Sequence, residues 1–341
     1  MTSISQDRTK LGFIGIGAMG LRIAGRLLKH GFQVTAFDRD TAKANALIES
    51  GGTVAQSIAE LASVADVVLS SLSNDESVSS VYAGPEGVLD HIRRGSMIIE
   101  MSTVNPETSR ELYRLGSARG VSVLDVPVSG STPAAEQGLL TLLCGGDEDS
   151  FNSAKAIFTA IGRQHFYLGP RGSGATMKLV VNTLLGVGMQ AIAEAVVFGE
   201  KAGLDRRRLF DVLSKTAVIA PAHLGKLTKV LDHDYRPEFA IGLMNKDFRL
   251  ILETALAVRA PMPAATAAFP INNAEFANHP DYDFCAVIDR MEDLANINYA
   301  GQKSQGETIS PEIKGELPQT QWKTPNTREG GGQFWGRSQV Y

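Results

Sequence analysis

The stretch Gly15-Ile16-Gly17-Ala18-Met19-Gly20 decides the fold. It follows a short apolar run that begins at Leu11, and it opens a stretch of helical periodicity that ends near His30. In a strand–turn–helix context the first glycine permits a tight turn, the second lets the backbone approach a pyrophosphate, and the third lets helix and strand pack closely. The helix N-terminus also presents free N–H groups to phosphates. These residues therefore predict a dinucleotide site formed by Gly15, Gly17, Ala18, Met19 and Gly20.

A carboxylate ends the next predicted strand, Gln33 to Asp38, 18 residues beyond the last glycine of the turn. In Rossmann folds a carboxylate at this point binds the ribose hydroxyls of the adenosine half of the cofactor. Its charge repels the extra phosphate of NADP, whereas the neighbouring Arg39 attracts that phosphate. Asp38 and Arg39 therefore predict a nicotinamide cofactor, with NAD favoured and NADP possible.

Strand candidates with helical stretches between them recur through the first half of the chain. The later strands are predicted at Val67 to Ser70, Met97 to Glu100, Val121 to Asp125, Leu139 to Cys144 and His165 to Leu168. This alternation predicts a parallel sheet covered by helices on both faces. Because ligands bind beyond the carboxyl ends of such strands, we expect Leu72, Ser73 and Thr103 to line the cofactor groove.

The pattern changes after Gly169. From Ala175 to about Ala202 the chain is apolar and lacks proline, which predicts one helix of about 28 residues, or roughly 42 Å. Its apolar residues lie nearly all round, so we expect it to be buried between domains or between subunits. Further helices are predicted at Asp205 to Lys215, Ala222 to Asp232, Met244 to Arg259, Pro263 to Asn278 and Phe284 to Asn296. The predicted fold class is an α/β Rossmann domain (residues 1–169) followed by an all-α domain (170–299), joined by a long interdomain helix.

Residues 300–341 differ from the rest of the chain in composition. They are rich in glycine, proline and scattered charges, and their apolar residues show no periodicity, which is typical of a flexible tail. Both tryptophans, Trp322 and Trp335, lie in this segment. An arm that docks its aromatic side chains on the body or on a neighbouring subunit is the alternative.

Composition limits the partners and the location of the protein. The formal net charge is −4 without a basic patch, so nucleic acid is not expected. The polar N-terminus lacks the apolar core of a signal peptide, and no uninterrupted apolar run reaches the roughly 20 residues of a membrane span. Cys144 and Cys285 are too few for a disulfide scaffold and lack metal-ligand spacing. We expect a cytoplasmic protein with no membrane contact and no metal.

Lys178 and Asn182 are candidate catalytic residues in the long apolar helix. They stand four positions apart, so their side chains share one helix face. Burial lowers the pKa of a lysine towards neutrality, which suits proton transfer, and an amide one turn away can hold a substrate hydroxyl or orient the amine. The spacing alone is equally compatible with a lysine that reaches water beside a structural asparagine.

Four motifs in order resemble the β-hydroxyacid dehydrogenase family, which includes 3-hydroxyisobutyrate dehydrogenase, and the resemblance covers about residues 10 to 299. The motifs are Gly12-Phe13-Ile14-Gly15-Ile16-Gly17-Ala18-Met19-Gly20, Asp125-Val126-Pro127-Val128-Ser129-Gly130, Gly174-Ala175-Thr176-Met177-Lys178-Leu179-Val180-Val181-Asn182 and Lys246-Asp247. The resemblance implies that Lys178 is the general acid/base and Asn182 its orienting partner. It also implies that Ser129, Gly130 and Ser131 bind the carboxylate of a small hydroxy acid or aldehyde substrate.

The same resemblance implies further contacts and an assembly. Lys246 is similar to the lysine that reaches both substrate and cofactor from the helical domain, with Asp247 beside it and Thr103 near the nicotinamide. Family members are dimers or tetramers, so we expect a homodimer or homotetramer. Ser131 is closer to the glyoxylate and succinic semialdehyde reductase branch, which leaves the substrate open. An imine reductase, which usually lacks the lysine, and a non-catalytic cofactor-binding scaffold are the alternatives.

Overall fold

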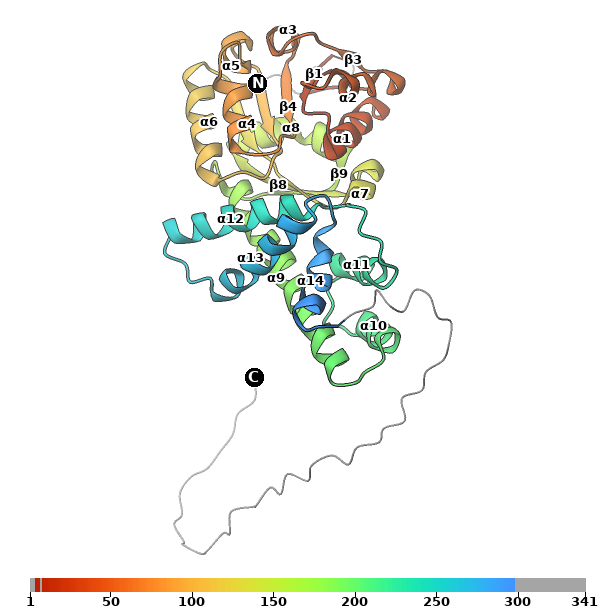
Figure 1. The fold of residues 1–341 in the computed structure, drawn as a ribbon. Coiled ribbons are helices and arrows are strands. Elements are labelled where there is room, and N and C mark those ends of the chain that lie inside the picture. Colours follow the sequence, from red (N-terminus) through yellow and green to blue (C-terminus); the bar gives the residue numbers. More distant parts are fainter. Residues whose placement is uncertain (1–3, 7, 298–341) are drawn as a thin grey trace, which may run out of the picture. The chain divides into compact units, whose positions relative to one another are not determined.

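The structure, a computed structural model, describes residues 4–6 and 8–297. The predictions made for residues 300–341, including Trp322 and Trp335, lie outside the described residues. An N-terminal α/β part is followed by an all-helical part, as the sequence predicts (Figure 1).

Nine strands form one sheet in the N-terminal part. They are β1 (Lys10–Ile14), β2 (Gln33–Phe37), β3 (Thr53–Val54), β4 (Val67–Ser70), β5 (Met97–Glu100), β6 (Ser122–Asp125), β7 (Val128–Ser129), β8 (Leu140–Gly146) and β9 (Gly162–Tyr167). The order is β3-β2-β1-β4-β5-β6-β8-β7, with β9 paired to β8. The pairs from β3 to β6 are parallel, but β8 runs antiparallel to both β6 and β7. The prediction of a parallel sheet is therefore wrong at this edge, where only the short helix α7 (Thr132–Gln137) separates β7 from β8 and the chain turns back on itself.

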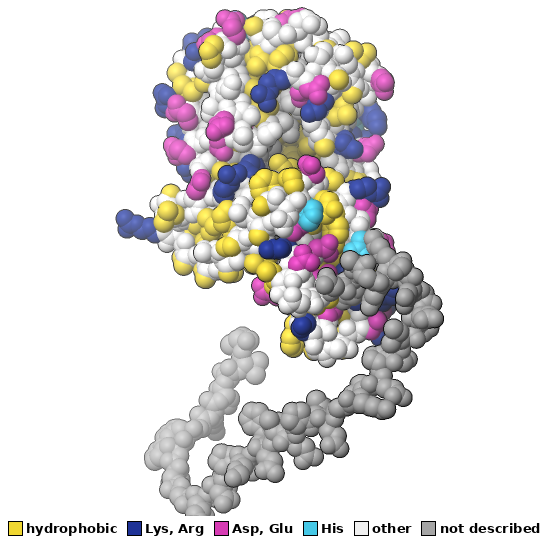
Figure 2. Space-filling view, in the orientation of Figure 1, with side chains coloured by type: hydrophobic (Ala, Val, Ile, Leu, Met, Phe, Trp, Pro, Cys, Tyr) yellow, Lys and Arg dark blue, Asp and Glu magenta, His cyan; other side chains and the backbone are white. Residues whose placement is uncertain are grey.

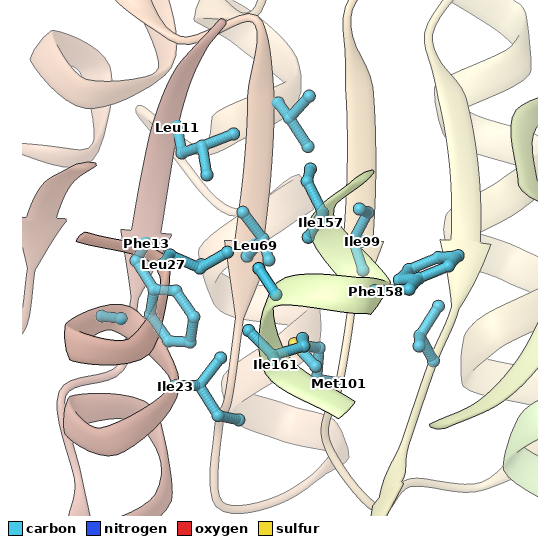
Figure 3. Packing of buried hydrophobic residues seen from close by; sticks show 14 of the residues in the cluster. Leu11, Phe13, Ile23, Leu27, Leu69, Ile99, Met101, Ile157, Phe158 and Ile161 are labelled. Atoms are coloured by element: carbon cyan, nitrogen blue, oxygen red, sulfur yellow. The ribbon is translucent and has the colours of Figure 1, made fainter. Parts of the chain in front are cut away.

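Helices cover both faces of the sheet, as predicted. They are α1 (Ala18–Lys29), α2 (Thr41–Asn45), α3 (Ile58–Val64), α4 (Asp75–Ala83), α5 (Val88–His91), α6 (Pro106–Ala118) and α8 (Glu148–Ile161). One core contains Phe13 and Leu69 from the sheet with Leu27 of α1 and Phe158 of α8 (Figure 3). The second core lies on the other face, where α3 to α6 pack on residues such as Ile98. Side chains alternate between the faces of a strand, so each central strand contributes to both cores.

The long helix α9 (Ser173–Lys201) connects the two parts of the chain. It packs against β6, β7 and β8 of the sheet and against the helices of the second part. Those helices are α10 (Arg206–Lys215), α11 (Pro221–Leu231), α12 (Ile241–Ala257), α13 (Pro263–Asn278) and α14 (Val287–Leu294). Their core includes Met244 and Phe248 of α12 and Val196 of α9. The predicted interdomain helix is confirmed, with bounds that differ by no more than two residues.

Burial of α9 within a single chain is partial, so the contacts between the two parts of the chain do not by themselves account for its expected burial between domains or between subunits. Val180, Leu184 and Phe198 are 51%, 72% and 76% exposed. Hydrophobic side chains also lie on the surface over α12 and α13 (Figure 2). Within the described residues, α9 is the one helix long and apolar enough to cross a membrane, and it packs against the sheet and against six other helices.

Asp125, at the end of β6, attaches α9 to the sheet. Its Oδ1 accepts a hydrogen bond of 2.9 Å from the backbone N–H of Gly172, and its Oδ2 accepts one of 2.9 Å from that of Ala175. The carboxylate thus satisfies N–H groups that have no partner within the helix and places a negative charge at the positive end of its dipole. Asp125 is 4% exposed, so water does not compete for these bonds.

We predict that Asp125→Ala lowers the free energy of unfolding by about 3 kcal/mol or more, because two charge-assisted bonds are lost and buried N–H groups remain unpaired. Urea unfolding followed by circular dichroism measures the change. The matched control is Asp90→Ala, which removes an exposed 3.1 Å ion pair with Arg119 and should cost less than about 1 kcal/mol. Equal losses in the two variants would contradict the role of Asp125.

Candidate active site

The glycine turn has the geometry that a dinucleotide requires. Gly15 has a φ of +92°, and a Cβ on it would lie 2.3 Å from the carbonyl oxygen of Ser71. A Cβ on Gly20 would lie 1.9 Å from the carbonyl oxygen of Gly15, so only glycine lets α1 approach β1 this closely. A Cβ on Gly17, in contrast, would meet nothing within 4 Å. The backbone is therefore open at the position where a pyrophosphate would approach, and α1 begins at Ala18 and Met19 directly behind it.

Asp38 holds the glycine turn against the end of β2. Its Oδ2 accepts a 2.8 Å hydrogen bond from the N–H of Ile16, and its Oδ1 accepts a 2.9 Å bond from the N–H of Asp40. Sequence reasoning missed this structural use of the carboxylate, because the residue spacing indicates only its position at the strand end. Arg39 is exposed beside it. Both residues lie at the strand end predicted for the adenosine half of the cofactor.

The two other predicted cofactor loops are hydrogen-bonded to each other. The N–H of Leu72, in the loop after β4, donates to Ser102 Oγ at 2.7 Å in the loop after β5. Ser73 and Thr103 are the neighbours of these two residues along the chain. The sequence places Ser102 in the loop of Thr103, but its bond to Leu72 could not be predicted from the sequence.

Lys246 connects α12 to these loops. Its Nζ donates a hydrogen bond to the backbone oxygen of Thr103 and forms a 3.1 Å ion pair with Asp247 Oδ1. Asp247 Oδ2 in turn accepts a 2.5 Å hydrogen bond from Asn182 Nδ2. A continuous polar chain therefore runs from Asn182 on α9, through α12, to the predicted nicotinamide loop.

Lys178 lies on the same face of α9, one turn before Asn182. Its side chain makes no hydrogen bond or ion pair with any of the described residues, whereas Asn182 is buried and bonded to Asp247. Burial lowers the pKa of Lys178, the negative charge of Asp247 raises it, and the positive charge of Lys246 lowers it again. The net pKa is below the usual value of a lysine, so the amine releases its proton more readily than an exposed lysine does.

The loop predicted to bind a carboxylate lies beside the helix that carries Lys178. Ser129 ends β7, which packs on α9, and Ser131 precedes the first residue of α7. Gly130 has a φ of +143°, and a Cβ on it would come within 2.8 Å of a methyl group of Leu140. Glycine is therefore required here for the loop to turn from β7 into α7, which leaves Gly130 and Ser131 exposed.

Two cavities lie apart from these residues. One of about 640 Å³ is bordered by α4, α6 and α12, with Asp75, Tyr82 and Leu250 among its lining residues. Another of about 370 Å³ is bordered by Arg110, Arg171 and Met177. Neither cavity is lined by Lys178 or by the glycine turn. The candidate active site is therefore defined by contacts between side chains and not by a cavity. No cluster of three or more His, Cys, Asp or Glu side chains suited to a metal occurs within residues 4–6 and 8–297.

The glycine turn and the strand order β3-β2-β1-β4-β5-β6 are those of a Rossmann fold that binds a dinucleotide. Residues 10–169 match the model of the NAD-binding domain of 6-phosphogluconate dehydrogenase. Residues 172–291 match the model described as NAD-binding of NADP-dependent 3-hydroxyisobutyrate dehydrogenase. The chain belongs to the β-hydroxyacid dehydrogenase family of nicotinamide-dependent oxidoreductases, which act on CH–OH groups in the relatives named dehydrogenase or reductase.

Individual relatives support this assignment. Glyoxylate/succinic semialdehyde reductase 1 of Arabidopsis thaliana is 36% identical over 284 residues, which are 83% of this chain and 98% of the relative. 2-(Hydroxymethyl)glutarate dehydrogenase of Eubacterium barkeri is 33% identical over 294 residues, which are 86% of this chain and 98% of the relative. The structure of Mycobacterium tuberculosis 3-hydroxyisobutyrate dehydrogenase with L-serine has a TM-score of 0.76 and 32% identity, and the match covers 82% of this chain and 98% of that one.

Removing either of the two charges beside Lys178 should shift its pKa, and the two shifts should be opposite in direction. Asp247→Asn removes the charge that raises the pKa, so the pKa of Lys178 should fall further. Lys246→Met removes the charge that lowers it, so the pKa should rise. The pH dependence of Lys178 labelling by an amine-reactive reagent, measured by peptide mass spectrometry, reports the neutral fraction. Arg249→Met, an exposed change on the same helix α12, is the control and should leave the pKa unchanged. Shifts in the same direction for both variants would contradict this electrostatic arrangement.

Proposed function

We propose that this chain transfers a hydride between a nicotinamide cofactor and a small β-hydroxy acid, or the matching semialdehyde or 2-oxo acid. The observation that carries the proposal is Lys178, which lies at the junction of sheet and helices with a lowered pKa and no hydrogen-bond partner within the described residues. Lys178 is only partly exposed, and a lysine held back from water without a partner is costly unless it has a function. An acid/base must instead remain open to its substrate.

Each residue of the proposed site has a separate role in the reaction. The loop Ser129-Gly130-Ser131 binds the substrate carboxylate, and Lys178 takes the hydroxyl proton in oxidation or returns it in reduction. Asn182 Oδ1 is buried without a partner among the described residues, so it is available to accept a hydrogen bond from the substrate hydroxyl or from the Lys178 ammonium. When bound, the nicotinamide accepts or supplies the hydride. Lys246 holds the loop of Thr103 beside these groups, so residues 170–299 complete a site that begins in residues 1–169.

The relatives suggest which substrates to test first. Their names include glyoxylate, succinic semialdehyde, 2-(hydroxymethyl)glutarate and 3-hydroxyisobutyrate, all small acids with a hydroxyl or carbonyl group near a carboxylate. An exposed carboxylate loop beside Lys178 is compatible with this class. An imine reductase-like activity and a non-catalytic cofactor-binding role are the alternatives, and neither accounts for an open lysine with a lowered pKa.

We also propose NAD as the favoured cofactor, a homodimer or homotetramer, and a cytoplasmic location. The negative charge of Asp38 at the end of β2 supports NAD over NADP. The exposed side of α9, with Leu184 and Phe198, is an apolar surface that a second copy would cover. Cys144 and Cys285 are both free and buried, which agrees with a reducing compartment.

We predict that Lys178→Ala lowers kcat by about 10²- to 10⁴-fold, the usual contribution of a general acid/base. Lys178→Arg should be similarly inactive, because a guanidinium does not release its proton. The wild-type oxidation rate should rise with pH through the lowered pKa of Lys178 and the reduction rate should fall, because oxidation needs the neutral amine and reduction the ammonium. NADH or NADPH absorbance at 340 nm measures turnover on the acids and aldehydes named above.

Lys201→Ala is the control for this experiment, because Lys201 is an exposed lysine of the same helix α9. It should retain wild-type turnover. Full turnover in Lys178→Ala with intact cofactor binding would overturn the proposed mechanism. A wild type that binds cofactor but turns over no acid, aldehyde or imine would favour the non-catalytic alternative.

The cofactor preference is predicted to depend on Asp38 and Arg39. Asp38→Asn should raise kcat/KM for NADPH relative to NADH by about tenfold, which corresponds to about 1.4 kcal/mol of removed repulsion. Arg39→Ala should reduce the use of NADPH while NADH changes little, because the exposed guanidinium is placed to attract only the extra phosphate. Steady-state kinetics with both cofactors measure the ratio. A wild type that prefers NADPH would show that Arg39 outweighs Asp38.

A further inference from the structure

A row of buried polar side chains crosses the sheet at the carboxyl ends of its central strands. Ser70 of β4 pairs in register with Glu100 of β5, and Glu100 pairs in register with Asp125 of β6. Their exposed fractions are 0%, 2% and 4%. Residues in register on neighbouring strands point to the same face of a sheet, so the three side chains lie side by side. The predicted cofactor loops begin directly after the first two of them.

Glu100 joins those two loops through one carboxyl oxygen. Its Oε1 accepts a 2.8 Å hydrogen bond from the N–H of Ser102 and a 3.4 Å bond from Ser70 Oγ. Ser102 Oγ accepts the 2.7 Å bond from the N–H of Leu72, and the hydroxyl of Tyr82 on α4 donates to Ser70 Oγ at 2.7 Å. The shape of both loops therefore depends on where Oε1 is held. The next residue after Ser102 is Thr103, whose carbonyl oxygen accepts the bond from Lys246.

The second carboxyl oxygen of Glu100, Oε2, does not bond to either loop. Oε2 is buried and makes no hydrogen bond with the described residues. The pKa of Glu100 is raised to about 7. Burial is the largest cause, bonds from Ser102 and Ser70 lower the pKa, and the negative charge of Asp125 raises it. The other titratable groups that face Glu100 are Asp125, whose pKa is also raised by burial, and Tyr82, whose pKa is raised by burial so that its hydroxyl stays protonated. With a pKa of about 7, Glu100 changes charge near neutral pH.

We propose that Glu100 is a positioning residue for cofactor binding: its carboxyl holds the loops after β4 and β5 in the arrangement that receives the nicotinamide half of the cofactor. The proposal rests on the dinucleotide site of the proposed function and adds a residue that does not itself touch the cofactor. Ionised Glu100 accepts stronger, charge-assisted bonds from Ser102 and Ser70 than neutral Glu100 does. Its negative charge also attracts the positively charged nicotinamide of NAD⁺. Both effects tighten NAD⁺ binding as pH rises through the titration of Glu100.

Isothermal titration calorimetry of the full chain with NAD⁺ alone tests the proposal between pH 6 and pH 8. Glu100→Ala should weaken binding by about tenfold or more, because a lost bond worth about 1.4 kcal/mol or more changes the Kd by that factor. Glu100→Gln keeps an acceptor oxygen for Ser102 and should bind NAD⁺ within a few-fold of wild type at pH 6. The wild-type Kd should decrease between pH 6 and pH 8, and that pH dependence should be absent from Glu100→Gln.

Ile98→Ala is the matched control, because Ile98 lies two residues earlier on the same face of β5, is fully buried and has no part in the polar row. It should lose stability, as a core truncation does, but keep its affinity for NAD⁺. The proposal is wrong if Glu100→Ala binds NAD⁺ no more weakly than Ile98→Ala, or if Glu100→Gln keeps the wild-type pH dependence. A wild type that binds neither NAD⁺ nor NADP⁺ would instead refute the proposed function, so the two failures are distinguishable.

A second pair of variants tests whether Glu100 acts through Ser102. Ser102→Ala removes the acceptor for the N–H of Leu72 and should weaken NAD⁺ binding in the same direction as Glu100→Ala. If both side chains hold one network, the double variant should lose less affinity than the product of the two single losses, as coupled residues do. Independent, multiplicative losses would contradict transmission through Ser102.

Discussion

The bond between the Asp125 carboxylate and the first amides of α9 is the constraint on which the other features depend. It fixes the N-terminus of the 29-residue helix at the carboxyl edge of the sheet, where parallel strands direct their loops. Lys178 follows one to two turns later and is therefore brought to that edge by helix geometry alone. Gly174 is required for this approach, because a Cβ there would lie 2.3 Å from the carbonyl oxygen of Leu143.

The site is tuned by charges of opposite sign on a neighbouring helix. Asp247 and Lys246 are consecutive residues of α12, yet one raises and the other lowers the pKa of Lys178. Each also makes a specific bond, Asp247 to Asn182 and Lys246 to the carbonyl of Thr103. The same two side chains thus shift the pKa of Lys178, the proposed acid/base, and attach the helical part to the loop of Thr103. A change in the position of α12 would therefore alter both the pKa of Lys178 and the contact of α12 with the loop of Thr103.

Three carboxylates at the strand ends fix the backbone of the loops and the helix that follow the sheet. Asp38 holds the glycine turn, Glu100 holds the loops of Leu72 and Ser102, and Asp125 holds α9. All three are carboxylates that accept backbone N–H groups, which are the donors left free where strands and helices end. The loops that would contact a ligand are thereby fixed by side chains that lie below them. This arrangement pre-organises a site without burying the surface that a ligand must reach.

The sequence by itself determined the fold class, the glycine turn, the long helix and the candidate residues Lys178 and Asn182. These features are local: glycine spacing, strand-to-helix alternation and helical periodicity are properties of neighbouring residues, and the described structure confirms the elements that they predict. Only the tertiary structure decided that β8 runs antiparallel, that one side of α9 is exposed, and that Glu100 and Ser102 connect two loops. Those features depend on which strands and helices become neighbours. The backbone N–H groups of Ile16, Gly172 and Ala175, which Asp38 and Asp125 accept, lie 22 to 50 residues away along the chain, so no spacing in the sequence reveals these bonds.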